Sequence, residues 1–124
     1  MKRLVLGLML LMTATAASAE WAVAYRDDEI AFYFDRTTIR RNGNLVKMLN
    51  LYDNKTLDFK STLSIRAQQE FDCKKERMRT LAQTGFSGQM AKGEVIYTND
   101  DTKKWTTVSP GTANEKLWKI ACGK

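Results

Sequence analysis

The sequence contains no histidine, one proline and two cysteines in 124 residues. Without histidine, the chain has no His-based catalytic triad, no imidazole general base and no histidine metal ligand. Two cysteines are too few for a thiolate metal site, and the sequence has no P-loop, no G-x-G-x-x-G and no G-x-S-x-G motif. A carboxylate pair of the glycosidase kind stays open, although no motif points to one. We therefore expect no catalytic residues, no metal, no cofactor and no enzyme activity.

The chain also lacks a hydrophobic run long enough to span a bilayer, which takes about 20 residues. Its apolar stretch at residues 4–12 follows a basic start, Lys2-Arg3, and precedes the small residues Ala17-Ser18-Ala19. This order is typical of a secretory signal peptide. The sequence predicts a signal peptide over residues 1–19, a single domain over residues 20–124 and no membrane span.

Export determines the expected chemistry of the two cysteines, Cys73 and Cys122. In an oxidising compartment, a lone pair of cysteines forms one disulfide. No cysteine lies near the expected cleavage site, so no lipid anchor is predicted. We expect a periplasmic, secreted or cell-surface protein with a Cys73–Cys122 disulfide.

The formal charge of the whole chain is +6, and it falls to +4 when Lys2 and Arg3 leave with the signal, since 18 basic residues then face 14 acidic ones. A basic excess favours contact with acidic glycans, lipid headgroups or nucleic acid. The acidic residues are interspersed throughout, however, and an ordinary solvated surface is the preferred interpretation. We expect a protein partner and no nucleic acid, and the sequence leaves a homodimer open.

Short alternating segments separated by turn residues predict four to six antiparallel strands. The strongest turn signal is Asn42-Gly43, which favours a two-residue hairpin loop. Apolar residues then meet on one face. The predicted register pairs Arg41 with Asn44, Ile39 with Val46, Thr37 with Met48, and Tyr33 with Tyr52.

Residues 62–73 alternate between apolar and polar side chains, which predicts a half-buried strand with Phe71 and Cys73 on its core side. Lys74-Lys75 can form a second tight loop. That register sets Phe71 opposite Met78 on the core face of the sheet. On the solvent face, it predicts two cross-strand ion pairs, Asp72 with Arg77 and Glu70 with Arg79. Ion pairing is the preferred role of these arginines over binding.

The end of the chain carries helix signals. Thr112-Ala113-Asn114-Glu115 after Pro110-Gly111 matches a capping box, and Gly123 suits the position just past a helix that ends near Ala121. We therefore predict an α+β fold, in which a small antiparallel sheet carries a C-terminal helix that one disulfide ties to it.

Five ordered segments carry a family resemblance. They are Ile39-Arg40-Arg41-Asn42-Gly43, Glu70-Phe71-Asp72-Cys73 followed by Arg77, Phe86-Ser87-Gly88-Gln89-Met90 ahead of Gly93, Trp105 with Pro110-Gly111-Thr112, and Leu117-Trp118-Lys119-Ile120-Ala121-Cys122. Together they resemble the bacterial surface-adhesin protein E family. The resemblance implies an antiparallel sheet with a disulfide-tied helix, a place in the bacterial envelope or on its surface, and attachment to host matrix and serum proteins.

Two functions are consistent with these features. The first is a non-catalytic binding protein of the bacterial envelope or surface, an adhesin that contacts host extracellular-matrix or serum proteins. The alternative is a periplasmic inhibitor or accessory module that acts on an enzyme or an envelope polymer.

The candidate contact residues project near turns or carry aromatic rings, and they are Arg40, Arg41, Lys103, Lys104, Tyr33 and Tyr52. The two tyrosines also suit the core or a dimer contact, which is the preferred interpretation.

Overall fold

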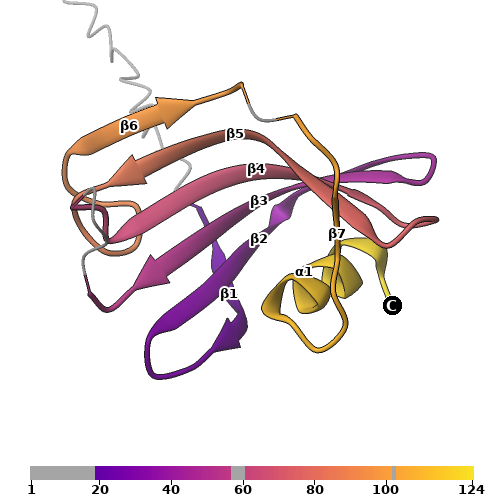
Figure 1. Cartoon of the computed structure of the whole chain (residues 1–124), viewed down its shortest axis with the longest axis horizontal. Helices are drawn as coiled ribbons and strands as arrows, with labels where there is room; N and C mark the ends of the chain where they lie inside the picture. The colour runs from indigo at the N-terminus through magenta and orange to yellow at the C-terminus, as the bar shows by residue number, and fades with distance from the viewer. Residues whose placement is uncertain (1–18, 57–60, 102) are drawn as a thin grey trace, which may run out of the picture.

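The computed structural model describes residues 19–56, 61–101 and 103–124, and in this part the chain forms one antiparallel sheet with a helix on one face (Figure 1). Six strands follow one another across the sheet in sequence order, and a seventh strand of two residues pairs with β5. The elements are β1 (Trp21–Arg26), β2 (Ile30–Asn42), β3 (Leu45–Asn54), β4 (Ser64–Asp72), β5 (Arg77–Phe86), β6 (Val95–Asn99), β7 (Thr106–Thr107) and α1 (Ala113–Cys122).

The sheet with its C-terminal helix confirms the predicted architecture, and the short strand β7 exceeds the predicted count. The predicted signal peptide lies outside the described residues, except for Ala19, and stays a prediction. Among the described residues, no helix is long and apolar enough to cross a membrane.

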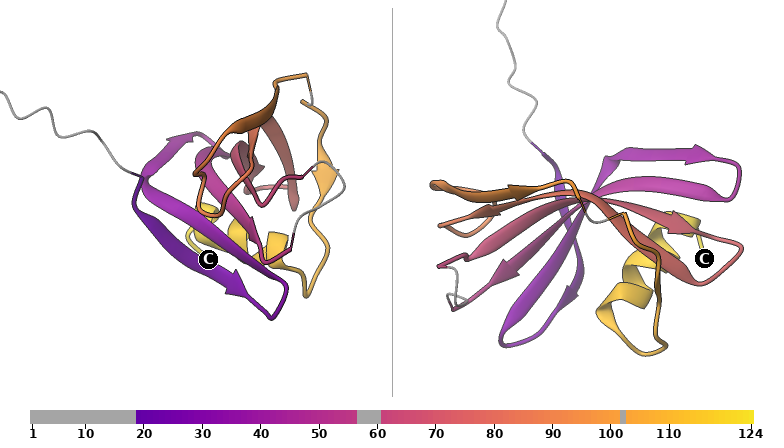
Figure 2. Two further views of the ribbon diagram at one scale, coloured as in Figure 1. Left: turned by 90° about the vertical axis from the view of Figure 1, so that its left-hand side faces the viewer. Right: turned by 45° about the horizontal axis from the view of Figure 1, so that its top comes forward.

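The core lies between the sheet and α1, which packs against β1 to β4 (Figure 2). Three fully or nearly fully buried residues, Val46, Phe71 and Met78, stand opposite one another on β3, β4 and β5 and form one row of the core. Leu117 and Trp118 of α1 are 0% and 5% exposed and belong to the same cluster. Because directly opposite residues share a face of the sheet, this row identifies the helix-covered face.

The predicted helix and disulfide are confirmed. The Thr112 hydroxyl accepts the Glu115 N–H at 3.3 Å, and Gly123, with φ of +68°, ends the helix in a left-handed conformation. The disulfide joins Cys73, just after β4, to Cys122, the last residue of α1, with their Cα atoms 5.5 Å apart. The C-terminal end of the helix is thus fixed to the end of β4, an inner strand of the sheet.

The predicted register of the β4–β5 hairpin is also confirmed. Phe71 lies opposite Met78, Asp72 opposite Arg77, and Glu70 opposite Arg79. Lys-Lys is a poor turn sequence by itself, but the Asp72 Oδ1 atom accepts the N–H groups of both Lys74 and Lys75 at 3.1 Å. The Asp72 side chain therefore supplies the turn stabilisation that the lysines lack.

The predicted register of the β2–β3 hairpin was wrong. The loop is Gly43-Asn44, between the paired residues Asn42 and Leu45, and φ of Gly43 is +61°. A two-residue hairpin loop with glycine first is typical of a type II′ turn, whereas the prediction assumed glycine second. Arg41 consequently lies opposite Val46 rather than Asn44.

A bulge shifts the same hairpin a second time, because residues 36–39 of β2 stand opposite Met48 alone. Local hydrogen bonds replace the regular ladder there. The Asp35 Oδ1 atom accepts the Thr37 N–H at 3.0 Å and the Thr37 hydroxyl at 2.6 Å, and the Thr38 Oγ1 atom accepts the Leu49 N–H at 2.9 Å. Short polar side chains compete with backbone pairing in this way, and the result is a bend in the strand.

Strand β4 is half-buried as predicted in its middle, where Arg66 and Gln68 are exposed on the face away from α1, but the two ends of the strand are buried on that face as well. On the face away from α1, Ser64, Glu70 and Asp72 are only 0%, 5% and 6% exposed. The loop after β5 covers Ser64, whose hydroxyl donates to the Gly88 carbonyl at 2.6 Å and accepts the Ala91 N–H at 2.9 Å. The two carboxylates are covered by their arginine partners on β5.

Candidate functional site

The predicted contact residues Arg40 and Arg41 lie exposed at the end of the β2–β3 hairpin, but their guanidinium groups bind their own hairpin. The Arg40 Nη1 atom donates to the carbonyls of Thr37 at 3.0 Å and Ile39 at 2.9 Å. The Arg41 Nε atom donates to the Gly43 carbonyl at 3.0 Å. Both charges are therefore held in place beside the turn.

The two predicted tyrosines lie on opposite faces, because the register differs from the predicted one. Tyr33 stands opposite Leu51 on the face away from α1, and its hydroxyl accepts a hydrogen bond from Arg26 at 3.3 Å. Tyr52 stands opposite Phe32 on the helix-covered face, and their rings are 4.5 Å apart. The Tyr52 hydroxyl donates to Gln69 Oε1 at 2.7 Å, and burial raises its pKa far above the ordinary value. Tyr52 therefore belongs to the interior of the fold.

Lys103 and Lys104 are exposed and lie in the segment that leads into β7. This segment is separate from the β2–β3 hairpin that carries Arg40 and Arg41. These six candidate residues thus do not form a single cluster, and a contact role for each of them stays a prediction.

A different set of charges forms a continuous line. Arg40 lies opposite Lys47, Lys47 opposite Glu70, and Glu70 opposite Arg79. Since opposite residues share a face, these four side chains cross strands β2 to β5 on the face away from α1. We call them the charged row. Beside the row, Arg40, Arg41, Asn42, Leu45, Lys47 and Glu70 line a shallow hollow of about 200 Å³.

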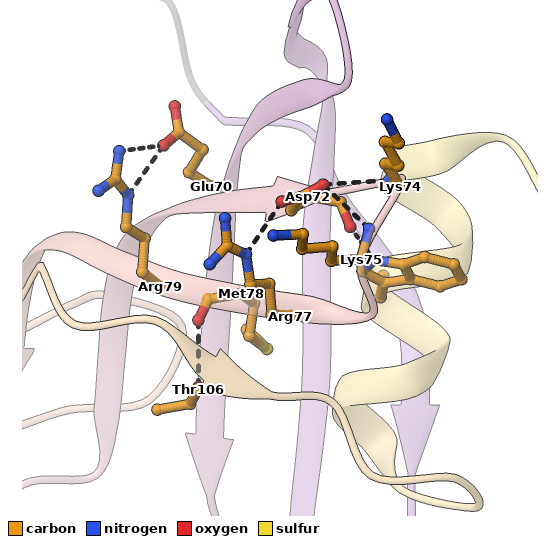
Figure 3. A network of polar contacts seen from close by, with 9 residues as sticks. Glu70, Asp72, Lys74, Lys75, Arg77, Met78, Arg79 and Thr106 are labelled. Carbon is orange, nitrogen blue, oxygen red and sulfur yellow. Dashed lines mark hydrogen bonds and ion pairs between the residues drawn. The ribbon is translucent and has the colours of Figure 1, made fainter.

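The row ends in a compact group that we call the arginine–tryptophan cluster: Glu70, Asp72, Arg77, Arg79 and Trp105. The Arg77 Nε atom lies 2.9 Å from Asp72 Oδ2, and the Arg79 Nε atom lies 2.9 Å from Glu70 Oε1. Both predicted ion pairs are confirmed. Figure 3 shows the four charged side chains on one side of the β4–β5 hairpin.

Trp105 joins the two ion pairs. The guanidinium carbons of Arg77 and Arg79 each lie 4.4 Å from the centre of its ring. The carboxylates are nearly buried, with side-chain exposures of 6% for Glu70 and 8% for Asp72, while Arg77 and Arg79 retain 35% and 27%. Buried carboxylates and an aromatic ring thus fix two guanidinium groups that still face solvent.

From the sequence, Arg77 and Arg79 were predicted to be ion-pair partners, and Lys47 and Trp105 were not among the predicted contact residues. The predicted β4–β5 register already placed both arginines side by side on one face of the hairpin, which could have indicated a binding site. Trp105 follows a polar turn far along the chain, and no local pattern indicates that its ring packs against β5.

The environment of Asp72 has a consequence for stability. Burial alone raises the pKa of this carboxyl, but the N–H groups of Lys75 and Lys74 and the guanidinium of Arg77 outweigh it, so the pKa lies below its ordinary value. A carboxyl with a lowered folded-state pKa contributes stability above its unfolded-state pKa, about 3.9, and loses it as the pH falls through the folded-state pKa.

We therefore expect Asp72→Asn to be less stable than the unchanged protein at pH 7, with the difference shrinking as the pH falls below about 4. Thermal unfolding of both proteins at a series of pH values from 7 down to about 2 measures the effect. Asp28→Asn, which removes an exposed carboxylate, is the control. A stability difference that stays constant down to the lowest pH would contradict the role assigned to the Asp72 charge.

The fold and the charged face define a class of protein: a small antiparallel-sheet domain with a disulfide-anchored helix on one face and an open charged surface on the other. The chain belongs to the surface-adhesin protein E family, which matches residues 21–123.

Solved structures of protein E from Haemophilus influenzae share the fold at low sequence identity. Crystal form II is 14% identical, has a TM-score of 0.62 and covers 74% of this chain and 80% of that chain. The selenomethionine form is 13% identical, has a TM-score of 0.59 and covers 86% of this chain and 95% of that chain. No curated protein matches the sequence. The family supports a surface adhesin, and these structures support the fold.

Proposed function

We propose that the protein is an exported, non-catalytic binding protein of the bacterial envelope or surface, which attaches to host extracellular-matrix or serum proteins. Membership of the surface-adhesin family supports this function. The observation that carries it is the open charged row from Arg40 to Arg79, which the fold presents on the face away from the helix.

The chemistry of this face suits contact with a protein. Arginine and tryptophan are enriched among the residues that dominate protein interfaces. A basic face also steers an acidic partner toward the surface and raises the association rate more than it raises the affinity. The charges at the β2–β3 hairpin are exposed and therefore act mainly over distance.

We expect the double reversal Arg40→Glu/Arg41→Glu to lower the association rate for the partner protein and to change the unfolding free energy by no more than about 0.5 kcal/mol, as is usual for exposed positions. The affected step is long-range attraction, which salt screens with a Debye length of about 8 Å at 0.15 M. Surface plasmon resonance on immobilised matrix and serum proteins, at low and at physiological salt, measures the rate.

Lys92→Glu/Lys116→Glu is the matched control, because it makes the same change of charge at exposed positions away from the hairpin. Binding that is independent of salt and survives the Arg40 and Arg41 reversals would remove the hairpin from the proposed interface. An absence of binding to every matrix and serum protein tested would contradict host attachment itself.

A further inference from the structure

We propose that the arginine–tryptophan cluster and the charged row form a binding site for a linear sulfated glycan, with Arg77 as the main sulfate ligand. This partner differs in kind from the protein partner proposed above. The glycan site also involves Arg77 and Trp105, which the proposed protein contact at the β2–β3 hairpin does not require.

The donor geometry of Arg77 is the first reason. Asp72 accepts from the Nε atom of Arg77, and within the described part of the chain no hydrogen bond engages its two Nη groups. The side chain is 35% exposed, so these groups face solvent. A pair of Nη groups on one guanidinium matches two oxygens of a sulfate, and a lysine cannot reproduce this bidentate fork.

The rigidity of the cluster is the second reason. Arg77 and Arg79 are each fixed by a nearly buried carboxylate, and the same Trp105 ring supports both. A long cationic side chain normally loses rotamer freedom when it binds a ligand. Here that freedom is already lost in the folded protein, so the binding of an anion costs little further side-chain entropy.

The distribution of charge is the third reason. The tips of the β2–β3 and β4–β5 hairpins lie at the same end of the sheet (Figure 1), and there seven cations stand against three carboxylates. The cations are Arg40, Arg41, Lys47, Lys74, Lys75, Arg77 and Arg79, and the carboxylates are Glu70, Asp72 and Glu76. The local excess of +4 equals the excess of the whole mature chain.

The shape of the site favours a linear polymer. The charged row crosses four neighbouring strands, which spans about 15 Å at a strand spacing of about 4.8 Å. The hollow beside the row is shallow, with a volume of about 200 Å³. Such a surface suits a chain that lies across the strands and places several sulfates against successive cations.

Other anionic partners fit less well. A membrane would need apolar side chains next to the cations, but the exposed large apolar residues of the described chain are Val23 on β1 and Val95 and Ile96 on β6. A nucleic acid would need an open aromatic face for base stacking. The Trp105 face carries two guanidinium groups instead. An acidic protein segment offers carboxylates, and the experiment compares it directly.

The test measures binding of the oxidised, purified protein by isothermal titration calorimetry at about 0.15 M salt, where weak surface charge effects are screened. The ligands are heparin, fully desulfated heparin and polyglutamate of similar length. We expect heparin to bind at least about tenfold more tightly than either of the others. Equal binding of polyglutamate or of desulfated heparin would overturn the sulfate assignment, as would an absence of heparin binding.

Variants locate the site. Arg77→Lys keeps the charge beside Asp72 but removes the fork, and we expect it to weaken heparin binding about tenfold, the scale of one charge-assisted contact. Lys47→Gln, at an exposed position of the row, tests the same surface without touching an ion pair. Lys119→Gln on α1 removes an equal charge on the other face and should bind heparin normally. Heparin binding unchanged in both Arg77→Lys and Lys47→Gln would overturn the proposal.

Tryptophan fluorescence gives an independent readout. Heparin should change the emission of the unchanged protein, and Trp105→Phe should lose most of this response, because Trp105 contacts both Arg77 and Arg79. The full response in Trp105→Phe would contradict the placement of the site. Binding to the matrix and serum proteins is measured in parallel, so a failure of glycan binding and a failure of protein attachment are distinguished.

Discussion

Loss of the Cys73–Cys122 disulfide is expected to lower the free energy of unfolding by about 4 kcal/mol, according to the chain-entropy relation for a bridge of this span. The bridge joins residues that are 49 positions apart. Typical domains have a net stability of only about 5–15 kcal/mol, so the bridge supplies a large part of the total. Thermal and denaturant unfolding of the Cys73→Ser/Cys122→Ser variant beside the oxidised protein measure the loss.

The loss should appear first in α1. The helix has ten residues and is too short to be stable by itself in water. Without the bridge, the helix is held to the sheet by its packing, by the Trp118 hydrogen bond and by the contact of Lys116 with the Tyr25 ring. Hydrogen exchange should therefore show amides of α1 opening before those of β3 and β4. Uniform loss of protection throughout the domain, or two alkylatable thiols in native oxidised protein, would contradict this account.

The elements that the sequence predicted correctly have local causes. The capping residue Thr112 and the terminal Gly123 lie next to the helix they delimit, and the Asp72 and Glu70 pairs follow from a loop of only four residues, 73–76. Over such short distances, the chemistry of a few neighbouring residues determines the geometry. The disulfide joins residues 49 positions apart and was predictable for another reason, because the sequence contains only two cysteines.

The β2–β3 hairpin shows where local reasoning fails. Asn-Gly allowed a loop at two adjacent positions, and the competing hydrogen bonds of Asp35, Thr37 and Thr38 produced a bulge that no alternation pattern contains. Each one-residue shift moves side chains to the other face. That is why Tyr33 and Tyr52 separated, and why Lys47 came to stand between Arg40 and Glu70.

The candidate site was predicted only in part for the same reason. Its ion pairs lie within one hairpin and were found, but the position of Trp105 depends on the path of the chain between β6 and β7. The burial of Glu70 and Asp72 depends on the arginines of β5 that cover them. A polar residue on an alternating strand looks solvated until the segment that covers it is known.

A hydrogen bond connects α1 to the segment that carries the arginine–tryptophan cluster. Trp118 is 5% exposed, and its Nε1 atom donates to the carbonyl of Asp72 at 2.9 Å. The backbone of Asp72 is thus held by the helix, while its carboxylate holds Arg77. We expect Trp118→Ala to cost about 3–5 kcal/mol, since it removes a large buried ring and leaves a cavity.

Trp118→Phe separates packing from hydrogen bonding. It keeps an aromatic ring in the core but leaves the buried Asp72 carbonyl without its donor, which should cost about 1–3 kcal/mol. Chemical denaturation of both variants measures these losses, with Trp21→Phe at a half-buried position of β1 as the control. If Trp118→Phe were as stable as the unchanged protein, the hydrogen bond would not support the segment that carries Asp72. If Trp118→Ala lost less than about 1 kcal/mol, the helix itself would contribute little to the core.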